Sequence, residues 1–168
     1  NFMPQLPGQG MGVYETGKGE IAVVNLIGQY QMDVHCDNPF YKIDDILRQY
    51  QGIPTVVDFH AEASSEKLAM GFYLDGRVGA IWGTHCHVPT ADLRILPQGT
   101  GYISDLGMTG PRDSVLGIRP EQSISLFRGE LTSRFAPAAG PCWLTGAIFT
   151  LDGHGKCVAV EQVLDIDV

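Results

Sequence analysis

The sequence predicts an α/β fold, and three patterns support that prediction. Apolar runs suited to buried strands alternate with stretches of helical spacing in the first half of the chain. Residues 55–82 have the order strand, helix, strand of a βαβ unit. The second half is mostly strand-like. Because 168 residues are enough to bury one core, we expect a single domain over residues 1–168.

The first elements of this alternation come before residue 52. A loop rich in proline and glycine at residues 4–12 leads to a strand at Ile21–Ile27. Asp37 or Asn38 can cap the helix that follows, and Pro39 suits the first turn of that helix because no backbone donor is needed there. The apolar residues at helical spacing are Ile43, Ile46, Leu47 and Tyr50.

The βαβ unit comes next in the chain. A strand at Thr55–Phe59 leads directly to His60, and Ser64 or Ser65 can cap the following helix. The residues expected on the buried face of this helix are Leu68, Met70, Phe72 and Tyr73. The strand at Val78–Trp82 should lie parallel to the first, which brings both carboxyl ends to one edge of the sheet.

The second half of the chain supplies more strands and one helix. The expected strands are Leu93–Leu96, Gly101–Ser104, Trp143–Leu151 and Lys156–Leu164, and the helix lies near Glu121–Arg128. A tight turn joins the last two strands and contains His154. We therefore expect His154 to be exposed to solvent and not to bind metal.

Three histidines follow the ends of the two parallel strands. His60 ends the first strand, and His85 and His87 follow the second within Gly83-Thr84-His85-Cys86-His87. In an extended backbone His85 and His87 would point to the same side, roughly 6 to 7 Å apart. A pair of hydrogen-bonded loop histidines would have the same spacing. Because open α/β sheets place their chemistry at strand carboxyl ends, we predict that His60, His85 and His87 bind metal.

Two common metal sites with a His-x-His motif are disfavoured by the surrounding sequence. A metallo-β-lactamase site would continue with an Asp-His pair shortly after the second histidine, whereas Val88-Pro89-Thr90-Ala91 follows here. An amidohydrolase barrel needs about 250 residues of repeated βα units, which is longer than this chain. Neither class explains the motif.

Several further segments accompany the histidines. They are His60-Ala61-Glu62, Ser65-Glu66-Lys67, Gly83-Thr84-His85-Cys86-His87-Val88, Thr90-Ala91-Asp92, Arg94-Ile95-Leu96-Pro97 and Asp105-Leu106-Gly107-Met108-Thr109-Gly110-Pro111. Together they resemble the YmdB-type branch of the calcineurin-like metallophosphoesterases. The resemblance implies a four-layer α-β-β-α sandwich in which two metal ions, bridged by a carboxylate and a water or hydroxide, hydrolyse phosphodiesters such as 2′,3′-cyclic nucleotides. It assigns His60 and His85 to the second metal ion and His87 to the first.

The sequence departs from this family in its remaining ligands. The family has an Asp after its first strand, a Glu-Asn pair after its second, and a Gly-Asn-His whose histidine is the proton donor, and none of these occurs here. We therefore expect the chain to correspond to the C-terminal two-thirds of the family domain, without the N-terminal βα units and without a catalytic residue of its own.

This departure has a consequence for activity. Neutral imidazoles cannot offset the charge of two metal ions or bridge them, so we predict that the chain alone is inactive or nearly inactive. The alternative is a non-catalytic fragment or assembly module that keeps the fold and binds at most one metal ion weakly. A complementing N-terminal half or a second copy of the chain is the expected partner, since a missing half would leave a sheet exposed.

The resemblance also implies cofactors and a substrate. Two divalent or trivalent ions, Fe, Mn or Zn, are expected, because nitrogen and oxygen ligands suit each of them. The candidates for contact with a phosphodiester or cyclic nucleotide are Arg94, Arg112 and Arg119. Asp58 shares the side of the strand that carries His60 and can either orient a ligand or make a hydrogen bond within the core, and Asp105 can position the glycine-rich loop or cap a turn. Glu62 and Glu66 are not expected to bind metal.

Composition excludes several other classes. The net charge of −8 and the scattered Lys and Arg residues argue against an extended nucleic-acid surface. The four cysteines have no CxxC spacing, so we expect reduced thiols and a cytoplasmic protein rather than a disulfide framework. No apolar run reaches the length of a membrane span.

Overall fold

A computed structural model of the chain describes residues 1–3, 5–131 and 133–166. Its elements, in chain order, are β1 Met11–Thr16, β2 Gly19–Ile27, α1 Pro39–Gln49, β3 Thr55–His60, α2 Ser64–Leu74, β4 Ala80–Thr84, β5 Arg94–Ile95, β6 Gly101–Ile103, β7 Gly110–Pro111, α3 Pro120–Phe127, β8 Cys142–Leu151 and β9 Cys157–Ile166. The α/β fold predicted from the sequence is confirmed.

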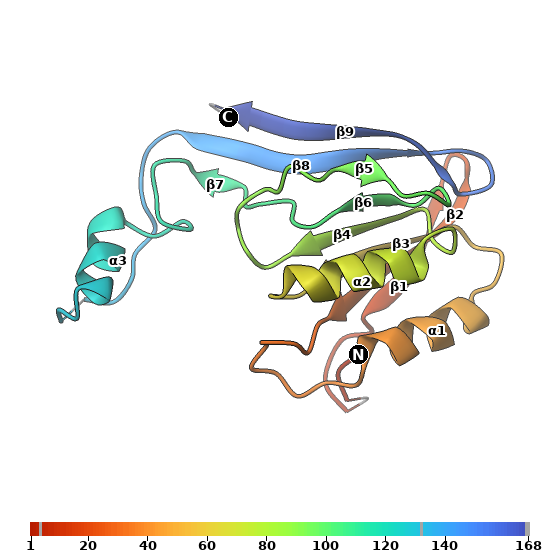
Figure 1. The fold of residues 1–168 in the computed structure, drawn as a ribbon, viewed down its shortest axis with the longest axis horizontal. Coiled ribbons are helices and arrows are strands. Elements are labelled where there is room, and N and C mark those ends of the chain that lie inside the picture. The colour runs from red at the N-terminus through yellow and green to blue at the C-terminus, as the bar shows by residue number, and fades with distance from the viewer. Residues whose placement is uncertain (4, 132, 167–168) are drawn as a thin grey trace.

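The strands form two sheets (Figure 1). The larger sheet has six strands in the order β1-β2-β3-β4-β6-β5, and its four central strands are parallel. The smaller sheet is antiparallel and has the order β7-β8-β9. In the larger sheet β3 and β4 are in a register that sets His60 opposite Thr84. The predicted meeting of these two strand ends is therefore confirmed.

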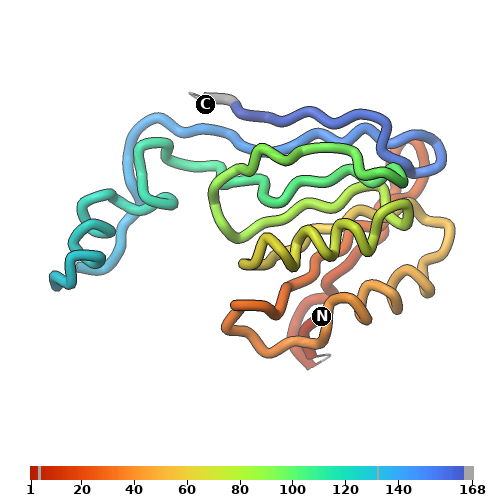
Figure 2. The backbone as a smooth tube through the Cα atoms, in the orientation of Figure 1, coloured from red at the N-terminus to blue at the C-terminus, as the bar shows by residue number. Residues whose placement is uncertain are grey.

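The described elements form three of the four layers that the resemblance implies, one of helices and two of strands. The helices α1 and α2 cover one face of the larger sheet through a core that includes Val57, Phe59, Ile43 and Met70. The hairpin of β8 and β9 covers part of the opposite face, where the ring of Phe149 stacks on the indole of Trp82 with centroids 6.1 Å apart. The outer face of this hairpin exposes Leu144 and Ile148. Residues 112–131, which include α3, and residues 133–141 extend away from the layers (Figure 2).

Local sequence signals explain the start of α1. The side chain of Asn38 accepts a hydrogen bond from the backbone N–H of Phe40 at 2.9 Å, and Pro39 occupies the first turn. This satisfies one of the backbone donors that a helix start leaves unpaired. Of the two caps that the sequence allowed, the structure selects Asn38.

Other local predictions were wrong. Strand β1 begins inside the segment that was expected to be a loop at residues 4–12, and residue 4 itself lies outside the described residues. Helix α2 has Ala63 at its cap position, with no side-chain hydrogen bond, in place of either serine. Phe72 and Tyr73, expected in the core, are 55% and 39% exposed.

The packing of Tyr102 explains the orientation of α2. A Cβ atom at Gly71 would lie 2.6 Å from the ring of Tyr102, so the missing side chain leaves room for that ring against the helix. The helix therefore turns Gly71, Met70 and Leu74 toward the sheet and leaves Phe72 outside. A rule based on apolar spacing alone cannot anticipate this, because it assigns glycine no packing role.

The structure bears on two further expectations, the state of the cysteines and the presence of a membrane-spanning helix. All four cysteines are unpaired, as predicted. Among the helices that the described residues form, none has the length and apolar character needed to cross a membrane.

Candidate metal centre

The carboxyl ends of β3 and β4 bring two histidines together. His60 is the last residue of β3, and His85 directly follows the end of β4. The Nε2 atom of His60 lies 3.1 Å from the Nδ1 atom of His85. The two rings are nearly perpendicular, with an interplanar angle of 89°. In this T-shaped arrangement Nε2 of His60 and Nδ1 of His85 are the nitrogens that face each other.

Each histidine is fixed through its second ring nitrogen. The hydroxyl of Thr84 donates to a carboxylate oxygen of Asp58 at 3.0 Å and faces Nδ1 of His60, also at 3.0 Å. Because the hydroxyl proton is used on Asp58, Nδ1 of His60 donates to Thr84. On the other ring, Nε2 of His85 lies 2.9 Å from Oε2 of Glu62, which can only accept.

These hydrogen bonds determine what the two facing nitrogens can do. When both histidines are neutral, the protons sit on the outer nitrogens, and Nε2 of His60 and Nδ1 of His85 present lone pairs to each other. Two lone pairs at 3.1 Å repel unless a positive charge lies between or beside them. The arrangement therefore suits a shared proton or a shared metal cation, since neutral imidazole is a common metal ligand.

The spacing of the facing nitrogens fits a metal ion. Two nitrogen ligands at about 2.0 to 2.1 Å from one ion, at an angle of about 90 to 110°, lie about 2.8 to 3.4 Å apart. The observed 3.1 Å falls within this range. Glu62 is a carboxylate, the kind of partner that ligating histidines usually contact through their other N–H, and Thr84 connects His60 to the carboxylate of Asp58.

The electrostatic surroundings favour the neutral form of His60. Burial, followed by the neighbouring His85, lowers the pKa of His60 below its ordinary value of 6.5. Asp58 acts in the opposite direction and raises this pKa, but its effect is smaller. Neutral imidazole is the form that binds a metal ion, so proton competition at His60 is weak near neutral pH.

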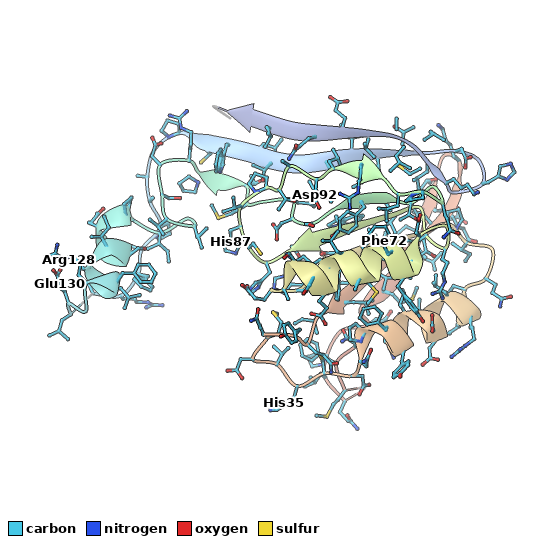
Figure 3. All side chains as sticks on the ribbon, viewed as in Figure 1. His35, Phe72, His87, Asp92, Arg128 and Glu130 are labelled. Atoms are coloured by element: carbon cyan, nitrogen blue, oxygen red, sulfur yellow. The ribbon has the colours of Figure 1, made fainter. Side chains whose placement is uncertain are left out.

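The structure does not bring His87 into this pair. The expectation that residues 85–87 are extended is wrong. His85 has φ 111° and His87 has φ 64°, which lie outside the extended region. His87 is exposed, in the loop beyond the end of β4 (Figure 3). Within the described part of the chain, no group of three or more His, Cys, Asp or Glu side chains is arranged to hold a metal ion. A ligand role for His87 remains a prediction.

Close packing at the end of β4 fixes the position of this loop. A Cβ atom at Gly83 would lie 1.8 Å from the backbone oxygen of Ser104, so only glycine allows the two segments to approach. Asp105 then accepts a hydrogen bond from the backbone N–H of Cys86 at 2.9 Å. The thiol of Cys86 points inward, 3.4 Å from the ammonium of Lys67.

A cleft of about 380 Å³ adjoins His60. Its lining includes His60, Asn25 and Lys42, together with much of the N-terminal segment 1–10. A cleft of this size can accommodate a small-molecule ligand. Of the arginines expected near phosphate, Arg94 lies over the ring of Tyr102 and donates to the backbone oxygen of Asp92, so its guanidinium is already engaged.

Sequence reasoning missed three residues of this site. The sequence does not lead us to expect a metal ligand at Glu62, and it assigns no role to Thr84 or Lys67. The register of β3 and β4 would have found Thr84, because it sets this residue beside His60. Nothing in the sequence indicates that Lys67 is buried, since lysine in the first turn of a helix is usually exposed.

The chain matches a known protein family over most of its length. Residues 1–163 match the model of a family described as YmdB-like protein. A 2′,3′-cyclic-nucleotide 2′-phosphodiesterase of Bacillus subtilis is 44% identical over 167 residues, which cover 98% of this chain and 63% of the relative. A putative phosphatase/phosphodiesterase of Mycoplasma pneumoniae is 40% identical over 161 residues, 95% of this chain and 57% of the relative.

Solved structures of similar proteins have the same fold. A hypothetical protein from Thermus thermophilus superposes with a TM-score of 0.92 at 36% identity, covering all of this chain and 66% of the other. A novel phosphatase from Mycoplasma pneumoniae superposes with a TM-score of 0.91 at 37% identity, covering 99% of this chain and 62% of the other. The chain thus spans less than two-thirds of the length of each of these relatives.

Proposed function

The chain belongs to the YmdB-like protein family, and from this membership we propose that it supplies the histidine ligands of a metal-dependent phosphodiester hydrolase. The relatives named phosphodiesterase or phosphatase support this reaction class. This chain covers 63% of the first of these relatives and 57% of the second, so we propose that it supplies only part of a complete hydrolase.

One observation carries the proposal. The facing nitrogens of His60 and His85 are 3.1 Å apart, and Thr84 and Glu62 hold the outer nitrogens so that both lone pairs converge. A pair of core histidines that served only packing would gain nothing from converging lone pairs, because their repulsion is unfavourable. A cation removes that repulsion.

The histidines would bind the metal ions, and the residues of the adjoining cleft would bind the substrate. His60 and His85 would hold one metal ion, and His87 would hold a second. Bound metal ions would neutralise the negative charge that develops on the phosphoryl group during hydrolysis. The adjoining cleft offers the ammonium group of Lys42 and the amide of Asn25 to an anionic, partly polar ester such as a 2′,3′-cyclic nucleotide.

Further ligands are needed for a complete centre. Neutral imidazoles do not offset the charge of two cations, so carboxylate ligands and a proton donor must come from elsewhere. We propose that they lie in the part of the relatives that this chain does not cover, and that the chain alone is inactive or nearly inactive. Fe, Mn and Zn all fit nitrogen ligands, and the supply of metal in the cell would choose among them.

Metal binding tests the ligand assignment directly. We expect the purified protein to bind Co²⁺ with a change in visible absorption, and the His60→Gln and His85→Gln variants to bind it more than about 100-fold more weakly, since even changes to outer partners cost about 10- to 100-fold. His154→Gln is the control, because His154 is exposed in the β8–β9 turn. Equal affinity of the wild type and both variants would refute the assignment.

Hydrolysis tests the reaction class. The chain alone should hydrolyse bis-p-nitrophenyl phosphate and 2′,3′-cyclic nucleotides slowly or not at all. Addition of a polypeptide corresponding to the uncovered N-terminal part of a relative should restore hydrolysis, and His85→Gln should abolish the restored rate. If the restored rate survives His85→Gln, the histidine pair has no part in the reaction.

The exposed apolar surface and the unpaired thiols bear on the partner and on the location of the protein. The complementing N-terminal part would cover apolar surface on the larger sheet or the outer face of β8 and β9, where Leu144 and Ile148 are exposed. Self-association through the same surface is the competing arrangement. We propose a cytoplasmic location, where the four unpaired thiols would stay reduced.

A further inference from the structure

A buried ion pair contacts the loop of residues 85–87 at Cys86, and the proposed function gives it no part. The ammonium of Lys67, in the first turns of α2, lies 2.8 Å from Oδ2 of Asp105, which follows the end of β6. Both side chains are only 2% exposed. Charges are rarely buried this deeply unless several partners compensate them.

The carboxylate of Asp105 joins two loops. Its Oδ2 atom accepts a hydrogen bond from the backbone N–H of Cys86 at 2.9 Å, in addition to the contact with Lys67. Its Oδ1 atom accepts from the backbone N–H of Gly107, also at 2.9 Å. The histidine-bearing loop 85–87 and the glycine-rich loop 106–110 are therefore tied to one carboxylate.

Loop 85–87 needs such a tie because of its backbone conformation. His85 and His87, on either side of Cys86, have φ values of 111° and 64°. Side chains with a Cβ atom rarely adopt this region, so the conformation must be imposed by surrounding contacts. The hydrogen bond from Cys86 to Asp105 turns the N–H inward at the one residue between the two strained positions.

This conformation determines where the ring of His85 lies. With the backbone of Cys86 fixed, Nδ1 of His85 lies 3.1 Å from Nε2 of His60. Lys67 compensates the charge of Asp105, and its ammonium also contacts the thiol of Cys86 at 3.4 Å. Helix α2 thereby contacts the loop that carries His85, although neither histidine of the pair lies on this helix.

We propose that Lys67 and Asp105 are positioning residues that hold the loop of His85, Cys86 and His87 in its cation-binding shape. The inference rests on the proposed function, because it gives the histidine pair a cation to bind. It goes beyond that function in assigning the cause of the ligand geometry to an ion pair on the far side of the loop.

A purely structural role is the competing explanation, and Asp75 provides the matched control. Asp75 is 5% exposed and accepts hydrogen bonds from the backbone N–H groups of Gln98 and Thr100 at 2.9 and 3.3 Å. It thus also ties a loop to the end of an element, but at the opposite edge of the sheet. Replacing Asp75 should cost stability without changing the histidine pair.

The test compares Co²⁺ affinity in three proteins: wild type, the double variant Lys67→Met/Asp105→Leu, and Asp75→Asn. Replacing both partners of a buried ion pair by apolar residues is often tolerated, so the double variant should fold while losing the acceptor for Cys86. We expect its Co²⁺ affinity to fall about 10- to 100-fold, as for other changes behind a metal ligand. The Asp75→Asn variant should bind Co²⁺ like the wild type.

Hydrogen exchange at the backbone N–H of Cys86 gives a second readout that needs no metal. In the wild type this amide should exchange as slowly as the amides of β4, and in the double variant it should exchange much faster. A folded double variant with unchanged Co²⁺ affinity overturns the proposal. If the double variant does not fold, the wild type alone decides. Slow exchange of its Cys86 amide then supports the proposal, and rapid exchange of that amide overturns it.

The two proposals fail in different ways. If the wild type binds no Co²⁺, the proposed metal function is wrong, while the exchange rate of Cys86 still decides whether Asp105 holds the loop. If His85→Gln abolishes Co²⁺ binding but the folded double variant binds normally, the metal function stands and the positioning role is wrong.

Discussion

The parallel strands of the larger sheet all begin at one edge, the amino edge, and all end at the opposite one, the carboxyl edge. Both edges have a buried carboxylate that binds backbone N–H groups, but the two differ in the residues around it. At the amino edge, the buried carboxylate of Asp75 accepts two backbone hydrogen bonds and secures the turn before β6. At the carboxyl edge, the buried carboxylate of Asp105 accepts backbone hydrogen bonds from Cys86 and Gly107. The carboxyl edge additionally has a compensating lysine and two facing imidazoles.

This difference separates the features that packing explains from those on which the proposed metal binding rests. A buried carboxylate that caps a turn is present at both edges and is explained by the need to satisfy backbone donors. Non-glycine residues with positive φ and converging lone pairs occur together at the carboxyl edge, in residues 60–87. A strained backbone at about 1 to 3 kcal/mol for each residue is kept only where surrounding contacts impose it.

The largest effect should come from closing the space that glycine leaves at the carboxyl edge. A Cβ atom at Gly83 would lie 1.8 Å from the backbone oxygen of Ser104, so Gly83→Ala must displace the loop that carries Asp105. We expect the free energy of unfolding in urea to fall by about 3 kcal/mol or more, the upper range for overpacking.

Gly79, near the amino edge, is the control for this change. A Cβ atom there would lie 2.7 Å from the backbone oxygen of Gly155 and from a side-chain carbon of Leu151, which is a milder overlap. Gly79→Ala should therefore cost about 1 to 3 kcal/mol. A smaller loss for Gly83→Ala than for Gly79→Ala would show that the carboxyl edge is not the more tightly constrained of the two.

Each edge also has a threonine whose hydroxyl makes hydrogen bonds, Thr84 at the carboxyl edge and Thr100 at the amino edge. The hydroxyl of Thr84 links Asp58 to His60, whereas the buried hydroxyl of Thr100 donates to the backbone oxygen of Val78 at 2.7 Å. Thr84→Val should weaken Co²⁺ binding about tenfold, because His60 loses the acceptor that fixes its proton. Thr100→Val should reduce stability by about 1 to 3 kcal/mol through an unsatisfied partner.

Calorimetric titration with Co²⁺ measures the metal affinity of both variants. Thr100→Val should bind Co²⁺ like the wild type, because this side chain lies at the amino edge. Equal losses of affinity in the two variants would mean that binding reports general stability and that the edges do not differ in function.

The smallest expected effect is an acid sensitivity at the carboxyl edge. Burial would raise the pKa of Asp92, but hydrogen bonds from Ser104 and Thr90 outweigh it and lower the pKa below its usual 3.8. The unfolded chain therefore takes up this proton at higher pH than the folded chain. The stabilisation is present above pH 3.8 and is lost as pH falls through the lower folded pKa.

Thermal unfolding of the wild type and Asp92→Asn detects this contribution. The advantage of the wild type in melting temperature should shrink from about pH 5 to about pH 3, because over this range the unfolded chain binds the proton of Asp92 more readily than the folded chain does. Asp92 lies among the carboxyl-edge loops (Figure 3). An advantage that stays constant over this range would show that the charge of Asp92 contributes nothing to stability.

The central part of the fold could be predicted from sequence because its signals are local. The runs at 55–59 and 78–82 are apolar, and the helix between them fixes their parallel direction. Strand β1 was missed because Gly10, Gly12 and Gly17 make its surroundings look like a loop, whereas pairing with β2 holds it extended. Such pairing is a tertiary effect that local propensity does not contain.

The candidate site was only partly predictable for a similar reason. His60 and His85 could be placed together because both follow adjacent parallel strands. The bent shape of residues 85–87 could not, since it depends on Asp105, 19 positions away from Cys86. The burial of Lys67 likewise depends on Asp105, 38 positions away. These contacts exist only once the sheet has brought the segments together.

Anomalous diffraction from crystals of the protein soaked in Zn²⁺ would test the central claim most directly. We predict an anomalous peak within about 2.2 Å of both Nε2 of His60 and Nδ1 of His85, with Thr84 and Glu62 still in contact with the outer nitrogens. Zn²⁺ peaks found elsewhere on the molecule, with none between these two nitrogens, would contradict it.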